Sequence, residues 1–159
     1  MVEDDTLVVN APGILSNDSD VEGDTLTVFQ FGFASHGELN LFDDGSFSYT
    51  PDPDYSGSDQ FYYHAFDGQE YSSLTEVIIN VTPVNDPPVI VSTAPSTGTQ
   101  GEEYLYAIEV DDPDDTIFNY LLFDAPNGIS IDFNTGILTW TPLYGGDYRP
   151  INLRVQHYF

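Results

Sequence analysis

Residues 44–51 of the chain read DGSFSYTP, and residues 135–142 read TGILTWTP. The glycines and prolines of the two stretches coincide after a shift of 91 residues, from Gly45 to Gly136. Each stretch places a turn-forming glycine before alternating side chains, which is typical of a β-strand that follows a tight turn. A repeat of this kind predicts two copies of one module in tandem.

The remainder of the chain has the same pattern of short strands and turns. Apolar residues alternate with others in residues 26–28, 39–41, 47–49, 61–63, 77–81 and 151–155. Period two, interrupted by Gly, Asp, Asn and Pro, predicts strands with one buried face. Hairpin turns are predicted at residues 43–45 and 134–136, and no stretch has sustained helical periodicity. The predicted fold is all-β, with two antiparallel β-sandwiches in series, each of about seven strands.

Residues 82–88, TPVNDPP, form a stiff connector between the two predicted modules, 1–86 and 87–159. The 91-residue shift places the counterpart of the strand at 75–81 near residues 166–172, beyond Phe159. It places the counterpart of a strand at 89–93 around residue 1. We therefore expect the first module to have a truncated opening strand and the second module to lack its final strand.

The composition excludes several classes of partner. The chain has 159 residues with 27 Asp and Glu against 2 Lys and Arg, a net charge of −25, and no cysteine. So few cations exclude ordinary nucleic-acid binding and attraction to an anionic membrane surface. The absence of cysteine excludes disulfides and thiolate metal sites. The 11 Tyr and 11 Phe argue for a folded core rather than disorder.

Residues 17–24, NDSDVEGD, form the densest acidic cluster. Carboxylates at alternate positions around a glycine turn can direct several oxygens at one cation, and calcium prefers oxygen ligands. The other interpretation is a solvated acidic loop. The spacing is not that of an EF-hand, which needs flanking helices and a glutamate at the twelfth loop position.

Longer motifs indicate a family for each module. The first resembles the bacterial cadherin-like tandem repeats of large surface adhesins in residues 11–20 (APGILSNDSD), 23–28 (GDTLTV), 36–41 (HGELNL), 44–51 and 84–88 (VNDPP). The second resembles dystroglycan-type cadherin-like, or immunoglobulin-like, repeats in residues 101–106 (GEEYLY), 112–114 (DPD), 125–129 (APNGI) and 135–142.

This resemblance implies calcium at the ends of each sandwich. The ligands that it implies at the junction inside the chain are Glu3, Asn85, Asp86, Asp112 and Asp114, with Asp59 as a weaker candidate. Those that it implies at the far end of the first module are Asp18, Asp20, Asp24 and Asp67, a half-site to be completed by a preceding repeat. Two departures, Thr116 and His157, stand at positions that are acidic in the family and remove expected ligands from the inner junction.

The sequence does not indicate an enzyme. It has no Gly-x-Ser-x-Gly elbow, and its three histidines, His36, His64 and His157, do not have the spacing of a zinc motif. Paired carboxylates can hydrolyse glycosidic bonds, but the pairs in this chain are local and lie in loops, where they are better suited to holding a cation.

Aromatic residues leave a second function open. Phe61 and Tyr63 share one face of the strand at 61–66, and the register of the family that the first module resembles assigns this face to the core. The resemblance then implies that Tyr62, His64 and Phe66 face outward. Exposed aromatic side chains can stack on sugar rings or cover a partner surface. Tyr49 and Trp140 occupy equivalent repeat positions and are expected in the cores.

We therefore expect a calcium-rigidified spacer pair from a long bacterial adhesin, at the cell surface or secreted, whose partners are neighbouring repeats or other copies. One alternative is a carbohydrate-binding module of a secreted polysaccharide-degrading enzyme. Another is a subunit of a surface filament that completes its sheets by strand complementation, because an unpaired edge such as residues 151–155 can accept a strand from another chain.

Overall fold

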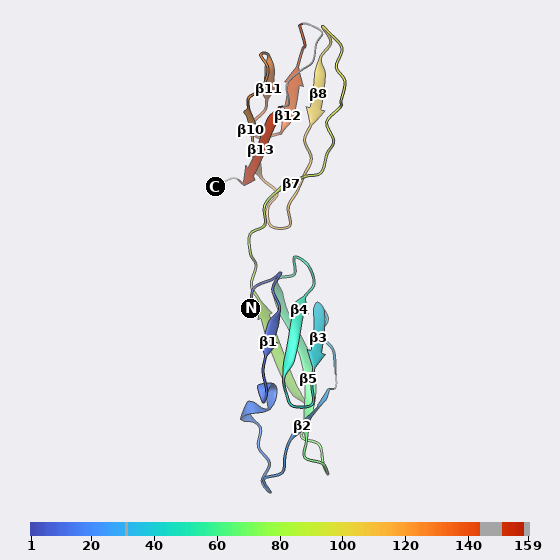
Figure 1. Ribbon diagram of the computed structural model, residues 1–159, viewed down its shortest axis with the longest axis vertical. Helices are drawn as coiled ribbons and strands as arrows, with labels where there is room; N and C mark the ends of the chain where they lie inside the picture. Colours follow the sequence, from blue (N-terminus) through green and yellow to red (C-terminus); the bar gives the residue numbers. More distant parts are fainter. Residues whose placement is uncertain (31, 144–150, 158–159) are drawn as a thin grey trace. The chain divides into compact units, whose positions relative to one another are not determined.

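The computed structural model describes residues 1–30, 32–143 and 151–157, and it divides into two compact units, Met1–Val84 and Asn85–Phe159 (Figure 1). We call them the first and second modules. Strands and turns dominate both, which confirms the all-β prediction. No helix among the described residues has the length and apolar character that crossing a membrane requires.

The first module is a sandwich of two three-stranded antiparallel sheets (Figure 1). One sheet has the order β1 (Leu7–Val9), β4 (Phe47–Pro51), β3 (Gly37–Leu41). The other has the order β2 (Thr27–Gln30), β5 (Gly57–Phe66), β6 (Thr75–Val81). A short 3-10 helix, η1 (Gly13–Asn17), follows β1.

The core of this module lies between the two sheets. Phe47 and Tyr49 of β4 pack with Phe61 of β5 and with Ile79 and Val81 of β6, and all five are buried. Along β5, buried residues alternate with exposed or half-buried ones from Asp59 to Phe66, so one face meets the core. The predicted inward orientation of Phe61 and Tyr63, and the outward orientation of the residues between them, are therefore confirmed.

A buried carboxylate ties the core to the loop before β3. Asp59 is 2% exposed and accepts hydrogen bonds from the backbone N–H groups of Ser35 (2.9 Å), His36 (2.8 Å) and Gln60 (2.8 Å) and from the Tyr49 hydroxyl (2.8 Å). Burial alone would raise its pKa, but these bonds outweigh burial and lower it. Both oxygens of Asp59, the weaker calcium candidate, thus accept hydrogen bonds inside the protein.

The first residues of the module run alongside the end of β6. Val2 forms a parallel bridge with Thr82. The Thr82 N–H donates to the Met1 carbonyl (3.0 Å) and the Glu3 N–H donates to the Thr82 carbonyl (3.1 Å). The buried Glu3 side chain also accepts a hydrogen bond from the Val84 N–H. The entry and exit segments of the module are therefore held together in parallel.

The predicted hairpin turn at residues 43–45 joins β3 to β4. Gly45 has a φ of 81°, in the left-handed region that favours glycine. It packs so closely on the segment before η1 that an added Cβ would collide with the carbonyl oxygen of Pro12. Its own carbonyl accepts a hydrogen bond from the Ile14 N–H (3.0 Å). This glycine therefore makes both the turn and the contact with η1.

The second module has shorter strands in three small sheets. Its strands are β7 (Val89–Ile90), β8 (Tyr104–Ala107), β9 (Val110–Asp111), β10 (Phe118–Phe123), β11 (Ile129–Ile131), β12 (Ile137–Trp140) and β13 (Asn152–His157). The sheet orders are β11-β12-β8, β10-β13 and β7-β9. The turn before β12 repeats the turn before β4, with Gly136 at a φ of 67°. Trp140 and Tyr49 were both expected in the cores. Tyr49 is 0% exposed, but Trp140 is only partly buried.

An apolar groove lies beside β13. Within the described residues, β13 pairs with β10 alone. The groove, of about 380 Å³, is lined by Ile90, Tyr104, Tyr106, Leu138, Ile151 and Leu153, among others. The 91-residue shift makes β5 of the first module the equivalent of β13. Strand β5 is paired on both edges, with β2 and with β6. This groove is where the repeat predicts a further strand.

Candidate metal sites

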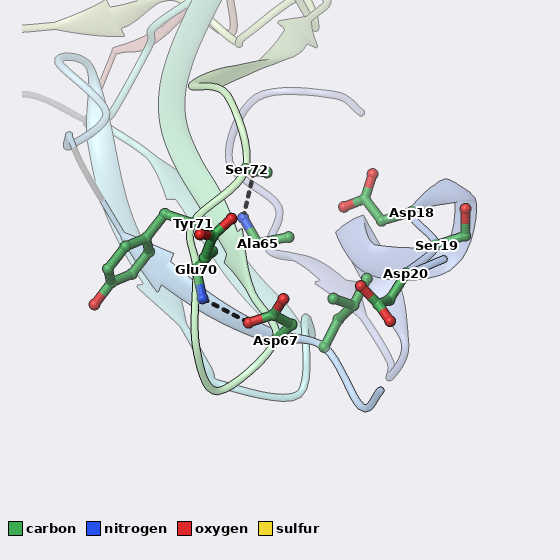
Figure 2. Close-up of a pocket in the computed structure, with 9 residues that line it drawn as sticks. Asp18, Ser19, Asp20, Ala65, Asp67, Glu70, Tyr71 and Ser72 are labelled. Carbon is green, nitrogen blue, oxygen red and sulfur yellow. Dashed lines mark hydrogen bonds between the residues drawn. The ribbon is translucent and has the colours of Figure 1, made fainter. Parts of the chain in front are cut away.

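Three of the predicted ligands in the first module line one pocket. Asp18 and Asp20 follow η1, and Asp67 follows β5, on the turn that leads toward β6. Figure 2 shows their carboxylates around this pocket, whose volume is about 260 Å³. Segments about 50 residues apart in the sequence, at Asp18 and Asp67, thus meet at one end of the sandwich.

Hydrogen bonds hold these carboxylates in place. The Tyr63 hydroxyl donates to Asp18 Oδ2 (2.8 Å), and burial together with this bond raises the pKa of Tyr63 to about 12. The Asp24 N–H donates to Asp20 Oδ1 (2.9 Å). Asp67 Oδ1 accepts the N–H groups of Gln69 and Glu70, and these bonds hold the pKa of Asp67 below its ordinary value. Each of these bonds uses a single oxygen of its carboxylate.

The fourth predicted ligand, Asp24, lines an adjacent pocket. This second pocket is formed by Glu22, Asp24, Asp67, Gln69 and Glu70, so Asp67 and Glu70 border both pockets. Glu70 was missed in the sequence because it lies outside the alternating run at 17–24 and becomes a neighbour only through the turn after β5. We call the acidic residues of both pockets, Asp18, Asp20, Glu22, Asp24, Asp67 and Glu70, the first-module cluster.

The donor chemistry of the first-module cluster fits calcium. All of its acidic side chains offer oxygen, and calcium takes about six to eight oxygen ligands in flexible geometry. The cluster has no sulfur or imidazole ligand that would favour a softer ion. Among the described residues Arg154 is the one Lys or Arg, and no salt bridge joins it to a carboxylate of the cluster.

The second module brings together its four predicted residues. The Asp86 N–H donates to Asp114 Oδ2 (2.7 Å), and the Asn85 side chain donates to the Asp86 carbonyl (3.0 Å). Asp112 Oδ1 accepts the N–H groups of Asp114 (2.9 Å) and Asp115 (2.8 Å). Glu3, the ligand predicted from the first module, accepts a hydrogen bond from the Val84 N–H within that module.

Two further residues join this group. His157 Nδ1 lies 2.8 Å from Asp115 Oδ2 and 3.7 Å from Asp112 Oδ2, and its Nε2 lies 3.2 Å from the Asn85 side-chain nitrogen. The family resemblance predicts that His157 removes an acidic ligand. In the structure, the end of β13 places the His157 ring beside the loop that carries Asp112 and Asp115. The residue type alone could have indicated that His157 is a candidate ligand, because imidazole also binds metal ions.

The outward-facing residues of β5, Tyr62, His64 and Phe66, have two kinds of neighbours. His64 and Phe66 lie near Phe29 and Tyr71, with ring centroids 4.5 Å apart for Phe66 and Tyr71 and 5.3 Å apart for Phe29 and Tyr71. Phe29 and Tyr71 are 50% and 56% exposed. Tyr62 is separate from this group, since its hydroxyl donates to Glu76 (2.9 Å) and accepts from Gln60 (2.8 Å). We call Phe29, His64, Phe66 and Tyr71 the aromatic patch.

Comparison with known protein families gives one match for each module. Residues 1–83 match the family described as "Bacterial cadherin-like domain". Residues 87–155 match the family described as "Putative Ig domain". No curated protein matches the chain.

Solved structures that match the chain come from proteins of different kinds. An endo-fucoidan hydrolase from glycoside hydrolase family 107 is 20% identical with a TM-score of 0.42, over 97% of this chain and 26% of that one. The human desmocollin-1 ectodomain is 19% identical with a TM-score of 0.43, over 91% and 31%. A human protocadherin-24 fragment, EC1-2, is 14% identical with a TM-score of 0.48, over 87% and 80%. The chain thus spans about a quarter of the hydrolase and a third of the desmocollin.

Proposed function

Because the chain belongs to the bacterial cadherin-like domain family, we propose that it is a calcium-rigidified spacer of a long extracellular adhesin. Cadherin-like and immunoglobulin-like domains are typical of extracellular proteins and are typically non-catalytic. The observation that carries the proposal is the arrangement of Asp18, Asp20 and Asp67 around one pocket at an end of the first sandwich.

The proposed mechanism is electrostatic. Carboxylates of the first-module cluster repel one another when no cation is present, since the chain has a net charge of −25. A bound calcium ion neutralises them and fixes the loop after η1 against the turn after β5. Ligands from a preceding repeat would complete the coordination and make a chain of such modules stiffer. The proposed partners are therefore neighbouring repeats of the same protein, at the cell surface or in a secreted form.

Thermal unfolding with and without calcium tests this proposal. Calcium that binds only the folded module stabilises it by about 2.7 kcal/mol at a hundredfold excess over Kd, or roughly 10 °C or more in Tm for a module of this size. Asp20→Asn is expected to shrink the response, because the amide keeps the oxygen that caps Asp24 but removes the charge. The measurement is calorimetry of the chain in calcium and in chelator.

The matched control is Asp44→Asn. Asp44 also caps a turn with one carboxylate oxygen, accepting the Ser46 N–H (3.0 Å), but it is not among the residues that line either acidic pocket. This variant should keep the full calcium response. A Tm of the unaltered chain that does not respond to calcium or chelator would contradict the proposal.

The aromatic patch favours a second candidate function, binding of a polysaccharide. Exposed aromatic rings suit the apolar faces of sugars, and Phe29 and Tyr71 are both half-exposed or more. The net charge of −25 disfavours sulfated or carboxylated glycans through repulsion. The ligand class under this alternative is therefore a neutral polysaccharide.

Affinity electrophoresis in gels that contain neutral polysaccharides tests the alternative. Tyr71→Ala is expected to abolish retardation, because Tyr71 contacts the other three rings of the patch. Phe33→Ala is the control, since Phe33 is 80% exposed and is not part of the patch. Equal mobility of the unaltered chain in all gels would exclude these glycans as ligands.

A further inference from the structure

We propose that the second module binds zinc through Asp112, Asp115 and His157. This site differs from the calcium proposal in its ion, its ligand chemistry and its module, so either proposal can fail without the other. The loop after β9 supplies both carboxylates, and the end of β13 supplies the imidazole. Sheet pairing between β10 and β13 places Phe118 opposite His157, which brings the ring next to the loop that leads into β10.

The ligand atoms have the spacing that a four-coordinate ion needs. His157 Nδ1 lies 2.8 Å from Asp115 Oδ2 and 3.7 Å from Asp112 Oδ2, and one atom of each residue lies within 4.8 Å of the other two. Tetrahedral zinc, with bonds of about 2.0–2.1 Å, separates its ligand atoms by roughly 3.3 Å. The distances of 2.8 Å and 3.7 Å lie on either side of that value.

Two buried atoms at this site lack hydrogen bonds. The Asp112 side chain is 0% exposed, and its Oδ1 accepts two backbone N–H groups. Its Oδ2 has no hydrogen-bond partner in the described part of the chain, and His157 Nδ1, despite its short distance to Asp115, makes no bond of proper geometry. Burying such an atom without a partner is unfavourable. A cation between them would satisfy both atoms.

The imidazole decides which cation. Calcium is a hard ion that takes oxygen ligands, whereas imidazole suits zinc and its neighbours in the first transition row. The other ring nitrogen, Nε2, lies 3.2 Å from the Asn85 side-chain amide. With zinc on Nδ1, Nε2 carries the proton, so the Asn85 amide must turn its oxygen toward the ring to accept it, as the outer acceptors of ligating histidines do. A histidine at this position therefore converts an acidic, calcium-type loop into a mixed nitrogen and oxygen site.

The test is titration of the metal-free 159-residue chain with Zn²⁺ in a large excess of Ca²⁺, which occupies the all-oxygen clusters. We expect one zinc site by calorimetry, and Co²⁺ in place of Zn²⁺ should give the intense visible bands of tetrahedral coordination. His157→Gln should weaken zinc binding by at least about tenfold, because glutamine can keep a polar atom near Asn85 but removes Nδ1. His157→Asp should lose zinc preference and gain calcium binding.

His64→Gln is the matched control and should bind zinc like the unaltered chain. Asp20→Asn should also leave zinc binding unchanged, which separates this test from that of the first-module cluster. Circular dichroism checks that each variant folds, and the shift of the His157 ring nitrogen signals in the unaltered chain reports ligation without any substitution. Equal zinc affinity in His157→Gln, displacement of zinc by calcium, or ring signals that do not move on adding zinc would overturn the proposal.

Discussion

Gly45→Ala is expected to destabilise the first module by about 3 kcal/mol and to lower its Tm by roughly 15 °C. Two effects add. Alanine is strained at a φ of 81°, and its Cβ would meet the Pro12 carbonyl oxygen, which is backbone and cannot move aside as a side chain would. The hairpin must then separate from η1, which weakens the bond from the Ile14 N–H to the Gly45 carbonyl. Chemical denaturation monitored by circular dichroism measures the loss.

Gly23→Ala separates the two effects. Gly23 has a φ of 85°, close to that of Gly45, but no atom lies within 4 Å of an added Cβ. Only the conformational strain remains, about 1 kcal/mol. If the two variants lost equal stability, the contact with Pro12 would have no part in the effect.

Asp59→Asn is expected to cost about 3 kcal/mol of unfolding free energy. Asparagine has the same shape, but its amide nitrogen cannot accept the hydrogen bonds that one carboxylate oxygen receives from His36 and Tyr49. At least one buried donor then faces another donor. Urea unfolding at neutral pH measures the difference from the unaltered chain.

The pH dependence of that difference has a defined sign. The pKa of Asp59 is lowered in the folded state, so its contribution is complete above the ordinary carboxyl pKa and disappears as the pH falls through the lowered value. The stability difference between Asp59→Asn and the unaltered chain should therefore shrink below about pH 4. Asp43→Asn, at an exposed position, should differ little at any pH. A difference that grew in acid would contradict the role given to the Asp59 carboxylate.

The strands were predictable because side-chain alternation follows directly from the pleat. In residues 61–66 the period of two separates the two faces, the register of the resembled family assigns Phe61 and Tyr63 to the core, and the structure has that face inward. Glycine turns before β4 and β12 were predictable for a similar reason, since few other residues adopt their φ. Trp140 departs from its repeat partner in being only partly buried, and its module has two-stranded sheets, β10-β13 and β7-β9, where the first module has a second three-stranded sheet.

From the sequence it was harder to predict which acidic residues are buried and hydrogen-bonded and which line a pocket, because the residue type is the same in both surroundings. Asp59 and Asp67 both stand near β5, but the backbone of Ser35 and His36 surrounds the first, and a pocket opens beside the second. The backbone N–H groups that bind the Asp59 carboxylate come from residues about 23 positions earlier in the sequence, and only the tertiary fold brings them together. The same holds for Glu70 and His157, whose neighbours come from distant loops.

The parallel contact between the entry and exit segments of the first module has a mechanical consequence. Residues 1–3 run in the same direction as residues 82–84. Tension applied at residue 1 and at residue 84 pulls the two segments in opposite directions along their length. The hydrogen bonds that join Met1 and Glu3 to Thr82, and Glu3 to Val84, are then loaded in shear and must break together, rather than one after another as in peeling. The module is thus built to resist stretching at the place where a pulled string of repeats would transmit the load.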